Sequence, residues 1–187
     1  GERSAEVLRV MTCLTVTPDS AQEAIEEEAN LIVTHHPLPF RPLKKLTGED
    51  TPGRLLLQLI RAGIAVYSPH TAFDSAAGGI NQRLAEGIGL QQIAPLDPLH
   101  EDPDELGAGR RGIFPEAISL NALIEKTKAF LKVDALQVVG RDEHPIQSVA
   151  VACGSAGQFL SAAHQAGCDA LLTGETNFHT CLEAEAL

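Results

Sequence analysis

The sequence has few aromatic and sulfur-containing residues, and these shortages argue against several classes of protein. Tryptophan is absent, and aromatic residues make up only 4% of the 187 residues. Base-stacking platforms and aromatic cages depend on such side chains, so we expect neither. The four cysteines show no Cys-x-x-Cys spacing. We therefore expect no disulfide framework and no thiolate metal site, and a reducing, cytoplasmic setting.

Positive charge and long apolar runs are also scarce. The chain carries 14 basic and 25 acidic residues, which gives a net charge of −11. Non-specific nucleic-acid binding needs a basic face, so we expect no nucleic-acid partner. No apolar run approaches the roughly 18 residues that span a bilayer, and no secretory signal pattern opens the chain. At 44% hydrophobic residues, the chain is expected to be globular and independent of membranes.

One pattern of helix and strand occurs three times along the chain. In each copy a helix ends at a small residue, a short apolar strand follows, and polar residues come at the end of that strand. The copies span residues 26–36, 60–70 and 164–175. This is the αβ unit of a mostly parallel sheet. We therefore predict an α/β fold of two packed α/β lobes with mostly parallel or mixed sheets.

Residues 91–112 are expected to connect the two lobes. The stretch is rich in proline, glycine and acidic residues, and is predicted to be an irregular linker or exposed loop. The first lobe would then span residues 1–100 and the second 101–187. Strands of the second lobe are predicted at 136–139 and 148–153. Both ends of the chain look abrupt, so we expect a fragment whose second lobe is incomplete at its C-terminus.

Two adjacent histidines, His35 and His36, end the first strand of the repeated pattern. Residues 31–34 read as a buried strand, and Pro37 keeps the chain extended through the pair. Neighbouring side chains on an extended chain point to opposite sides. Two such imidazoles do not easily chelate one ion, but they can each serve one of two adjacent ions. The alternative is a turn in which one histidine is a cap and the other is solvated.

Polar residues at the ends of the three strands form a set of possible metal ligands. Sites of parallel sheets lie beyond the carboxyl ends of the strands, so we expect these residues to meet there, between the lobes. The set consists of His35 and His36, His70 and Asp74, and Glu175 and His179. Nitrogen and oxygen donors without thiolate suit zinc, manganese, iron, cobalt or nickel. For each residue the alternative is a solvated or capping group. His70 could instead hold a metal ligand in place without contacting the ion itself.

Two further features could bind an anion. The segment Gly154-Ser-Ala-Gly157, between a strand and a helix, could present backbone N–H groups, although a tight helix entry explains it equally well. The cations Arg41, Lys44, Lys45 and Arg54 could contact a phosphate. More often such a cluster is simply a solvated loop.

Taken together, the motifs resemble those of the dinuclear-metal-centre proteins, also called GTP cyclohydrolase type 2 homologues or proteins like the NGG-interacting factor. The segment Thr34-His-His-Pro-Leu38 followed by Phe40 resembles the first metal motif of that family. The segment Ser68-Pro-His-Thr-Ala-Phe-Asp74 with Gly78-Gly-Ile-Asn81 resembles the second. Gly109-Arg-Arg-Gly112, Gly154-Ser-Ala-Gly157 and Thr173-Gly-Glu175 through His179 also match in order and spacing, so the resemblance covers nearly the whole chain.

The resemblance implies two packed α/β lobes, often in a ring-shaped hexamer, with two divalent metal ions per subunit. By motif, His35 and Asp74 would bind one ion and His36 the other. The remaining ligands of the family are a histidine and a glutamate in a motif near the C-terminus, and this sequence ends before that motif.

Two functions are open on this evidence. The first is a metal-dependent hydrolase of a nucleotide or phosphoester, in which His35, His36, Asp74 and His70 serve the metal site. Glu175 or His179 would transfer a proton as the catalytic residue. The family name suggests ring opening of a guanine nucleotide, but nothing in these residues selects a purine. The second function is a non-enzymatic, metal-binding oligomeric scaffold that engages partner proteins.

Overall fold

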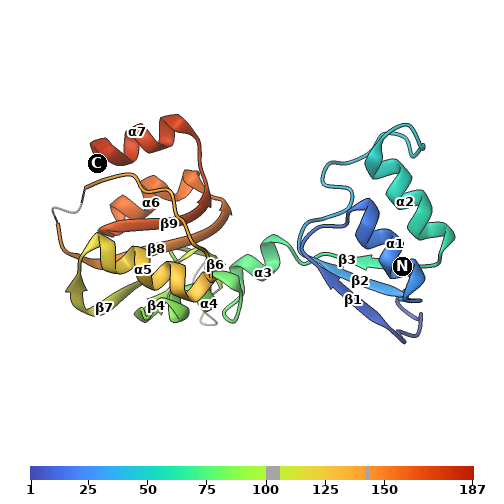
Figure 1. Cartoon of the computed structure of the whole chain (residues 1–187), viewed down its shortest axis with the longest axis horizontal. Coiled ribbons are helices and arrows are strands. Elements are labelled where there is room, and N and C mark those ends of the chain that lie inside the picture. Colours follow the sequence, from blue (N-terminus) through green and yellow to red (C-terminus); the bar gives the residue numbers. More distant parts are fainter. Residues whose placement is uncertain (100–105, 142–143) are drawn as a thin grey trace. The chain divides into compact units, whose positions relative to one another are not determined.

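The computed structural model describes residues 1–99, 106–141 and 144–187, which form two compact units, Gly1–Thr71 and Ala72–Leu187 (Figure 1). The sequence places the division near residue 100, whereas the compact units divide between Thr71 and Ala72. Helix α4 (Ile80–Gly87) accounts for this difference, because its Leu84 and Ile88 pack into the core of the second unit.

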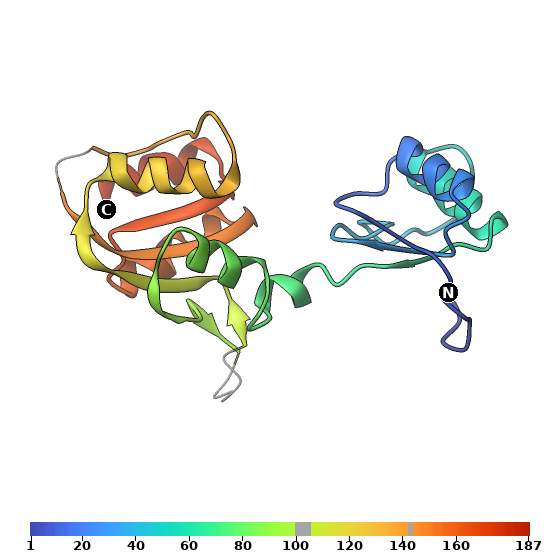
Figure 2. The ribbon, with the colours of Figure 1, turned by 60° about the horizontal axis from the view of Figure 1, so that its bottom comes forward.

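The first unit is a parallel sheet with helices on one face. Its strands lie in the order β1 (Val10–Cys13), β2 (Leu31–Thr34) and β3 (Ala65–Tyr67), and both pairings are parallel. Helices α1 (Pro18–Glu26) and α2 (Thr51–Arg61) lie on the same side of this sheet (Figure 2). Their apolar residues and the central strand form the core, which includes Ala21, Ala24, Ile32, Leu55 and Leu59.

Local sequence signals explain where these two helices begin. Thr17 caps α1 in a capping box with Ser20, and Pro18 takes the first helical position, where a missing N–H costs nothing. Asp50 caps α2, because its side chain accepts a hydrogen bond of 2.8 Å from the Gly53 amide. These caps fix where the connections from β1 into α1 and from β2 into α2 end.

The second unit is built on a mixed sheet in the order β4, β7, β8, β9. Strands β4, β7 and β8 pair antiparallel, while β8 and β9 pair parallel. The strands are β4 (Gln91–Ala94), β7 (Arg110–Ile118), β8 (Ile146–Ser155) and β9 (Ala170–Glu175), beside a small ribbon of β5 (Asp97–Pro98) and β6 (Gly107–Ala108). The predicted class, α/β with parallel and mixed sheets, is therefore confirmed.

Helices cover both faces of this second sheet. Leu84 of α4 and Leu123 of α5 (Leu120–Leu131) pack with Val149 and Val151 on one face. Ala163 of α6 (Leu160–Gln165) packs with Ala150 on the other. The remaining helices are α3 (Thr71–Ser75), the 3-10 turn η1 (Gly157–Phe159) and α7 (Phe178–Ala186).

Two local predictions are wrong. Residues 91–112 are not an irregular linker, because they contain β4, β5, β6 and the start of β7; residues 100–105 lie outside the described part. No strand forms at 136–139, where Val138 and Val139 are each 46% exposed. An apolar run makes a strand only where a neighbouring strand accepts its hydrogen bonds. Among the described residues, no helix is long and apolar enough to cross a membrane.

Candidate metal centre

The ends of two neighbouring strands carry three histidines of the first unit. His35 and His36 follow β2 directly, and His70 comes shortly after β3. The strands are parallel and adjacent, with Val33 paired to Tyr67, so both chains leave the sheet at the same edge. This edge is the one at which sites of parallel sheets form.

The three imidazoles lie close together. Their ring centroids are 5.1 Å apart for His35 and His36, 5.2 Å for His35 and His70, and 5.9 Å for His36 and His70. One ring nitrogen from each lies within 4.8 Å of the others, and all three residues are half-buried. Strand β2 ends at Thr34 and the chain bends at His35 and His36, so the pair is not held in the flat extended geometry that the sequence suggested.

Hydrogen bonds hold the backbone of the histidine pair in place. The Ser68 hydroxyl donates to the His35 carbonyl at 2.7 Å, which ties the end of β2 to the segment after β3. The buried Thr34 hydroxyl donates to the Leu14 carbonyl at 3.1 Å, and the His36 amide donates to the same carbonyl at 2.9 Å. The two imidazoles therefore project from a backbone that is fixed on both sides.

The hydroxyl of Thr15 fixes the orientation of one imidazole. Its Oγ1 atom lies 2.7 Å from Nδ1 of His36. When Nδ1 carries the proton and donates it to Thr15, Nε2 keeps a free lone pair for a metal ion. Sequence reasoning missed Thr15, because it precedes His36 by 21 residues and no local motif marks it.

His70 occupies an unusual backbone conformation. Its φ is 37°, in the left-handed region that non-glycine residues seldom adopt. Such conformations occur often at functional sites, where the surrounding structure holds them. The ring of Phe40, part of the first quoted motif, lies 6.0 Å from the His70 ring.

The donor set of this cluster fits a divalent transition-metal ion. Imidazole nitrogen is a common ligand for zinc, iron, cobalt and nickel. Three protein ligands, with a remaining position for water or substrate, are also the usual arrangement of catalytic zinc sites. Of the six residues that the sequence singled out, the structure brings together His35, His36 and His70.

Asp74 lies in α3, within the second unit, and its place in the ligand set stays a prediction. Asn81 donates to the Asp74 carbonyl at 3.0 Å and accepts from the Cys153 amide at 2.7 Å. Burial, and then the negative charge of Asp74, raise the pKa of the Cys153 thiol to about 11. The thiol of Cys153 is therefore protonated at neutral pH.

Glu175 and His179 lie near the end of β9, in the second unit. Glu175 lines a pocket of about 510 Å³, together with Ser155, Gly157, Gln158, Thr176, Asn177 and Thr180. His179 is exposed in the first turn of α7, where its ring lies 5.8 Å from that of Phe178. The catalytic roles of Glu175 and His179 stay predictions.

The glycine-rich entry after β8 is explained by close packing. A Cβ atom on Gly157 would lie 2.2 Å from the Thr176 hydroxyl, so only glycine fits between these segments. None of the seven residues that line the adjacent pocket is cationic. The segment Gly154-Ser-Ala-Gly157 therefore fits the tight helix entry better than an anion site.

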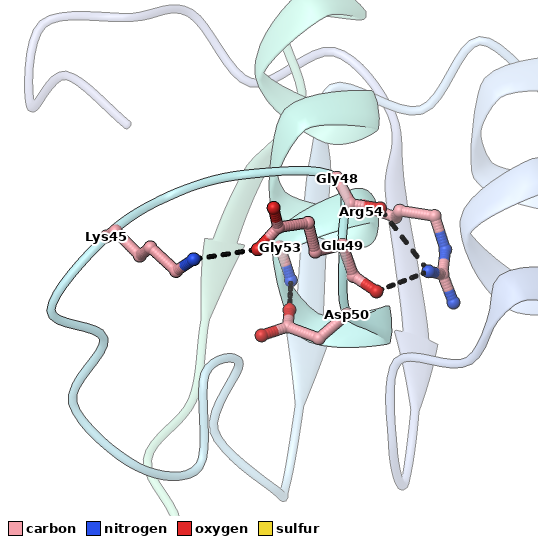
Figure 3. Close-up of polar contacts among 6 residues, drawn as sticks. All are labelled: Lys45, Gly48, Glu49, Asp50, Gly53 and Arg54. Carbon is pink, nitrogen blue, oxygen red and sulfur yellow. Dashed lines mark hydrogen bonds and ion pairs between the residues drawn. The ribbon is translucent and has the colours of Figure 1, made fainter.

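Two of the four cations after the histidine pair stabilise their own loop. Lys45 forms an ion pair of 2.7 Å with Glu49, and Arg54 donates to the carbonyls of Gly48 and Glu49 (Figure 3). These contacts favour the solvated-loop interpretation over a phosphate site.

Comparison with known proteins places this chain in a family. The family profile described as Duf34/NIF3 (NGG1p interacting factor 3) matches residues 1–187. A GTP cyclohydrolase 1 type 2 homolog of Clostridium acetobutylicum is 34% identical over 179 residues, which cover 96% of this chain and 67% of that protein. The Protein NIF3 homolog of Schizosaccharomyces pombe is 36% identical over 186 residues, covering 95% of this chain and 66% of that protein. The chain thus spans about two thirds of these relatives.

Solved structures show the same fold. A Bacillus cereus protein related to NIF3 superposes with a TM-score of 0.87 at 23% identity, covering 98% of this chain and 77% of that chain. Reduced HcgD from Methanocaldococcus jannaschii superposes with a TM-score of 0.77 at 26% identity, covering 100% and 71%. The chain therefore belongs to the Duf34/NIF3 (NGG1p interacting factor 3) family, as its motifs predicted.

Proposed function

We propose that the chain binds a divalent transition-metal ion through His35, His36 and His70, and that the protein is a metal-dependent hydrolase of a nucleotide or other phosphoester. The convergence of the three imidazoles at one edge of the sheet carries this proposal. The sequence motifs lead us to include Asp74 as a carboxylate ligand. They also lead us to include a second ion. The relatives named GTP cyclohydrolase 1 type 2 homologs support a hydrolytic role.

In this proposal the ion and the residues that serve it have distinct tasks. A bound divalent ion would lower the pKa of a water molecule and polarise the phosphoester bond. Thr15 occupies Nδ1 of His36 and so leaves Nε2 to the ion, and Ser68 holds the backbone at His35. Glu175 or His179 transfers the proton, as the sequence suggested.

Turnover by metal-loaded protein tests the proposal. The protein is incubated with Zn²⁺ or Mn²⁺ and with GTP or a nitrophenyl phosphodiester, and the product is quantified. We expect His70→Ala and Asp74→Ala to lose turnover, while His164→Ala, an exposed histidine of α6, keeps it. Turnover that survives in Asp74→Ala would contradict the two-ion mechanism, and equal losses in all three variants would contradict the assigned site.

A second candidate function is a metal-binding scaffold that engages other proteins. Helix α7 leaves Phe178 70% exposed and Leu182 48% exposed, and these residues are one turn apart on the same helix face. The family resemblance adds a hexameric ring as the expected assembly. Light scattering measures the assembly, and a stable oligomer that binds metal without any turnover would favour this function.

A further inference from the structure

A buried arginine of the second unit reaches the backbone that follows Asp74. Arg110, in the motif Gly109-Arg-Arg-Gly112, is only 1% exposed. Its guanidinium donates to the Ala76 carbonyl at 2.8 Å and, more weakly, to the Ser75 carbonyl at 3.4 Å. Since a buried charge is costly unless it is well hydrogen-bonded, these contacts are part of what keeps the arginine inside.

The other donors of Arg110 fix the guanidinium itself. They reach the carbonyls of Gly107 and Gly109 at 2.8 and 2.7 Å, and the side chain of Gln82 at 3.0 Å. The planar fork of arginine can serve several acceptors at once, which the single ammonium of lysine does poorly. Arg110 therefore links the segment after Asp74 to the start of β7 and to α4.

A buried asparagine holds the carbonyl of Asp74. Asn81 is 3% exposed, and its side chain lies between the Asp74 carbonyl and the Cys153 amide of β8. The carbonyls of Asp74, Ser75 and Ala76 thus all accept hydrogen bonds from the side chains of Asn81 and Arg110.

The turn between Asp74 and Asn81 leaves no room for a side chain at Gly79. A Cβ atom on Gly79 would lie 1.9 Å from the Phe73 carbonyl, although the φ of −79° would suit any residue. The Gly79 amide also donates to the Ala76 carbonyl at 2.9 Å. Gly79 therefore approaches the backbone of Phe73 closely, and its amide closes the turn that follows Asp74.

We propose that Arg110 and Asn81 are positioning residues that hold Asp74 in the orientation required of a metal ligand. The proposal rests on the metal role of Asp74 in the proposed function, and it assigns a task to the motif Gly109-Arg-Arg-Gly112, which had none. Aspartate has a short side chain, so its carboxylate moves with its backbone. Metal–ligand distances tolerate errors of only about 0.2 Å, so a small displacement of this turn would lower the affinity for the ion.

The test combines amide exchange with Zn²⁺ affinity in the full chain. The variants are Arg110→Lys and Asn81→Ala, and the matched control is Arg111→Lys, which alters the exposed neighbour of Arg110 in β7. Hydrogen exchange at the Gly79 amide reports the turn without any metal, and chelator competition gives the affinity. We expect faster Gly79 exchange and about 10- to 100-fold weaker Zn²⁺ binding in both variants, and neither change in the control.

A double-mutant cycle separates positioning from general destabilisation. In an Asp74→Asn background, Arg110→Lys and Asn81→Ala should weaken Zn²⁺ binding no further, although they should still lower the thermal unfolding temperature. Full additivity of the losses, or unchanged Gly79 exchange, would overturn the positioning role. Wild-type protein that binds no Zn²⁺ would instead refute the proposed function, and the positioning role with it.

Discussion

Single hydrogen bonds determine which atoms of the candidate site are available to an ion. The contact of 2.7 Å between Thr15 and Nδ1 of His36 leaves Nε2 as the free ring nitrogen. We expect Thr15→Ala to weaken Zn²⁺ binding by about 10-fold, because partners of ligand histidines typically contribute that much or more. Thr15→Ser keeps the hydroxyl and should keep the affinity. Chelator competition measures both, and equal affinities for the two variants would contradict this role of Thr15.

The thiol of Cys153 reports the charge on Asp74. Burial is the larger cause of its raised pKa of about 11, and the negative charge of Asp74 is the second. Asp74→Asn removes that charge, so the thiol pKa should fall while burial keeps it above the ordinary value. The thiolate would then form at lower pH. Alkylation of Cys153 followed by mass spectrometry across a pH series measures the shift.

A matched control for this experiment is Asp134→Asn, which removes an exposed carboxylate elsewhere in the second unit. Its Cys153 profile should match that of the wild type. If Asp74→Asn also leaves the profile unchanged, the carboxylate of Asp74 does not act on this thiol.

At the residue scale, the sequence singled out the three histidines that cluster in the structure, but not the residues that support them. His35, His36 and His70 could be identified because strand ends, proline and the family motifs mark them, and the structure brings their rings together. Thr15 and Arg110 could not be given roles, because their contacts depend on how distant segments pack.

At the scale of elements, β2 is the strand that delivers the histidine pair. Its Ile32 has no exposed surface and lies in the core under α1 and α2. We expect Ile32→Ala to lower the free energy of unfolding of the first unit by about 2–5 kcal/mol, since it leaves a cavity in a packed core. Val33→Ala, at a half-buried position of the same strand, should cost less.

Tyrosine fluorescence measures the unfolding of the first unit selectively. Tyr67 in β3 is the only tyrosine of the chain, which has no tryptophan, so the signal reports the first unit during urea unfolding. Equal unfolding midpoints for Ile32→Ala and Val33→Ala would contradict the inward orientation of Ile32.

Elements with their own local signals were predictable, and those that depend on partners were not. Thr17 and Ser119 cap α1 and α5, and threonine or serine before an apolar helical pattern is a local signal that the sequence itself carries. Strand β4 escaped prediction because it begins with the polar Gln91 and Gln92, and pairing with β7 makes it a strand. Residues 136–139 show the reverse, because they are apolar but do not form a strand.

At the scale of the whole molecule, the order of motifs identified the family and the α/β class, and both are confirmed. The boundary between the two units was harder to predict from the sequence, because it depends on whether α4 packs in the core of the first unit or of the second. Within this division, the three-histidine cluster belongs entirely to residues 1–71.

The measurement that tests the central claim most directly is anomalous X-ray scattering from crystals of the Zn²⁺-loaded chain. The account predicts an anomalous peak within ligand distance of ring nitrogens of His35, His36 and His70, roughly 2.0–2.1 Å for zinc. It also predicts that the peak is lost in a variant with all three histidines changed to alanine. A loaded chain with no peak at these histidines, or an unchanged zinc content in the triple variant, would contradict it.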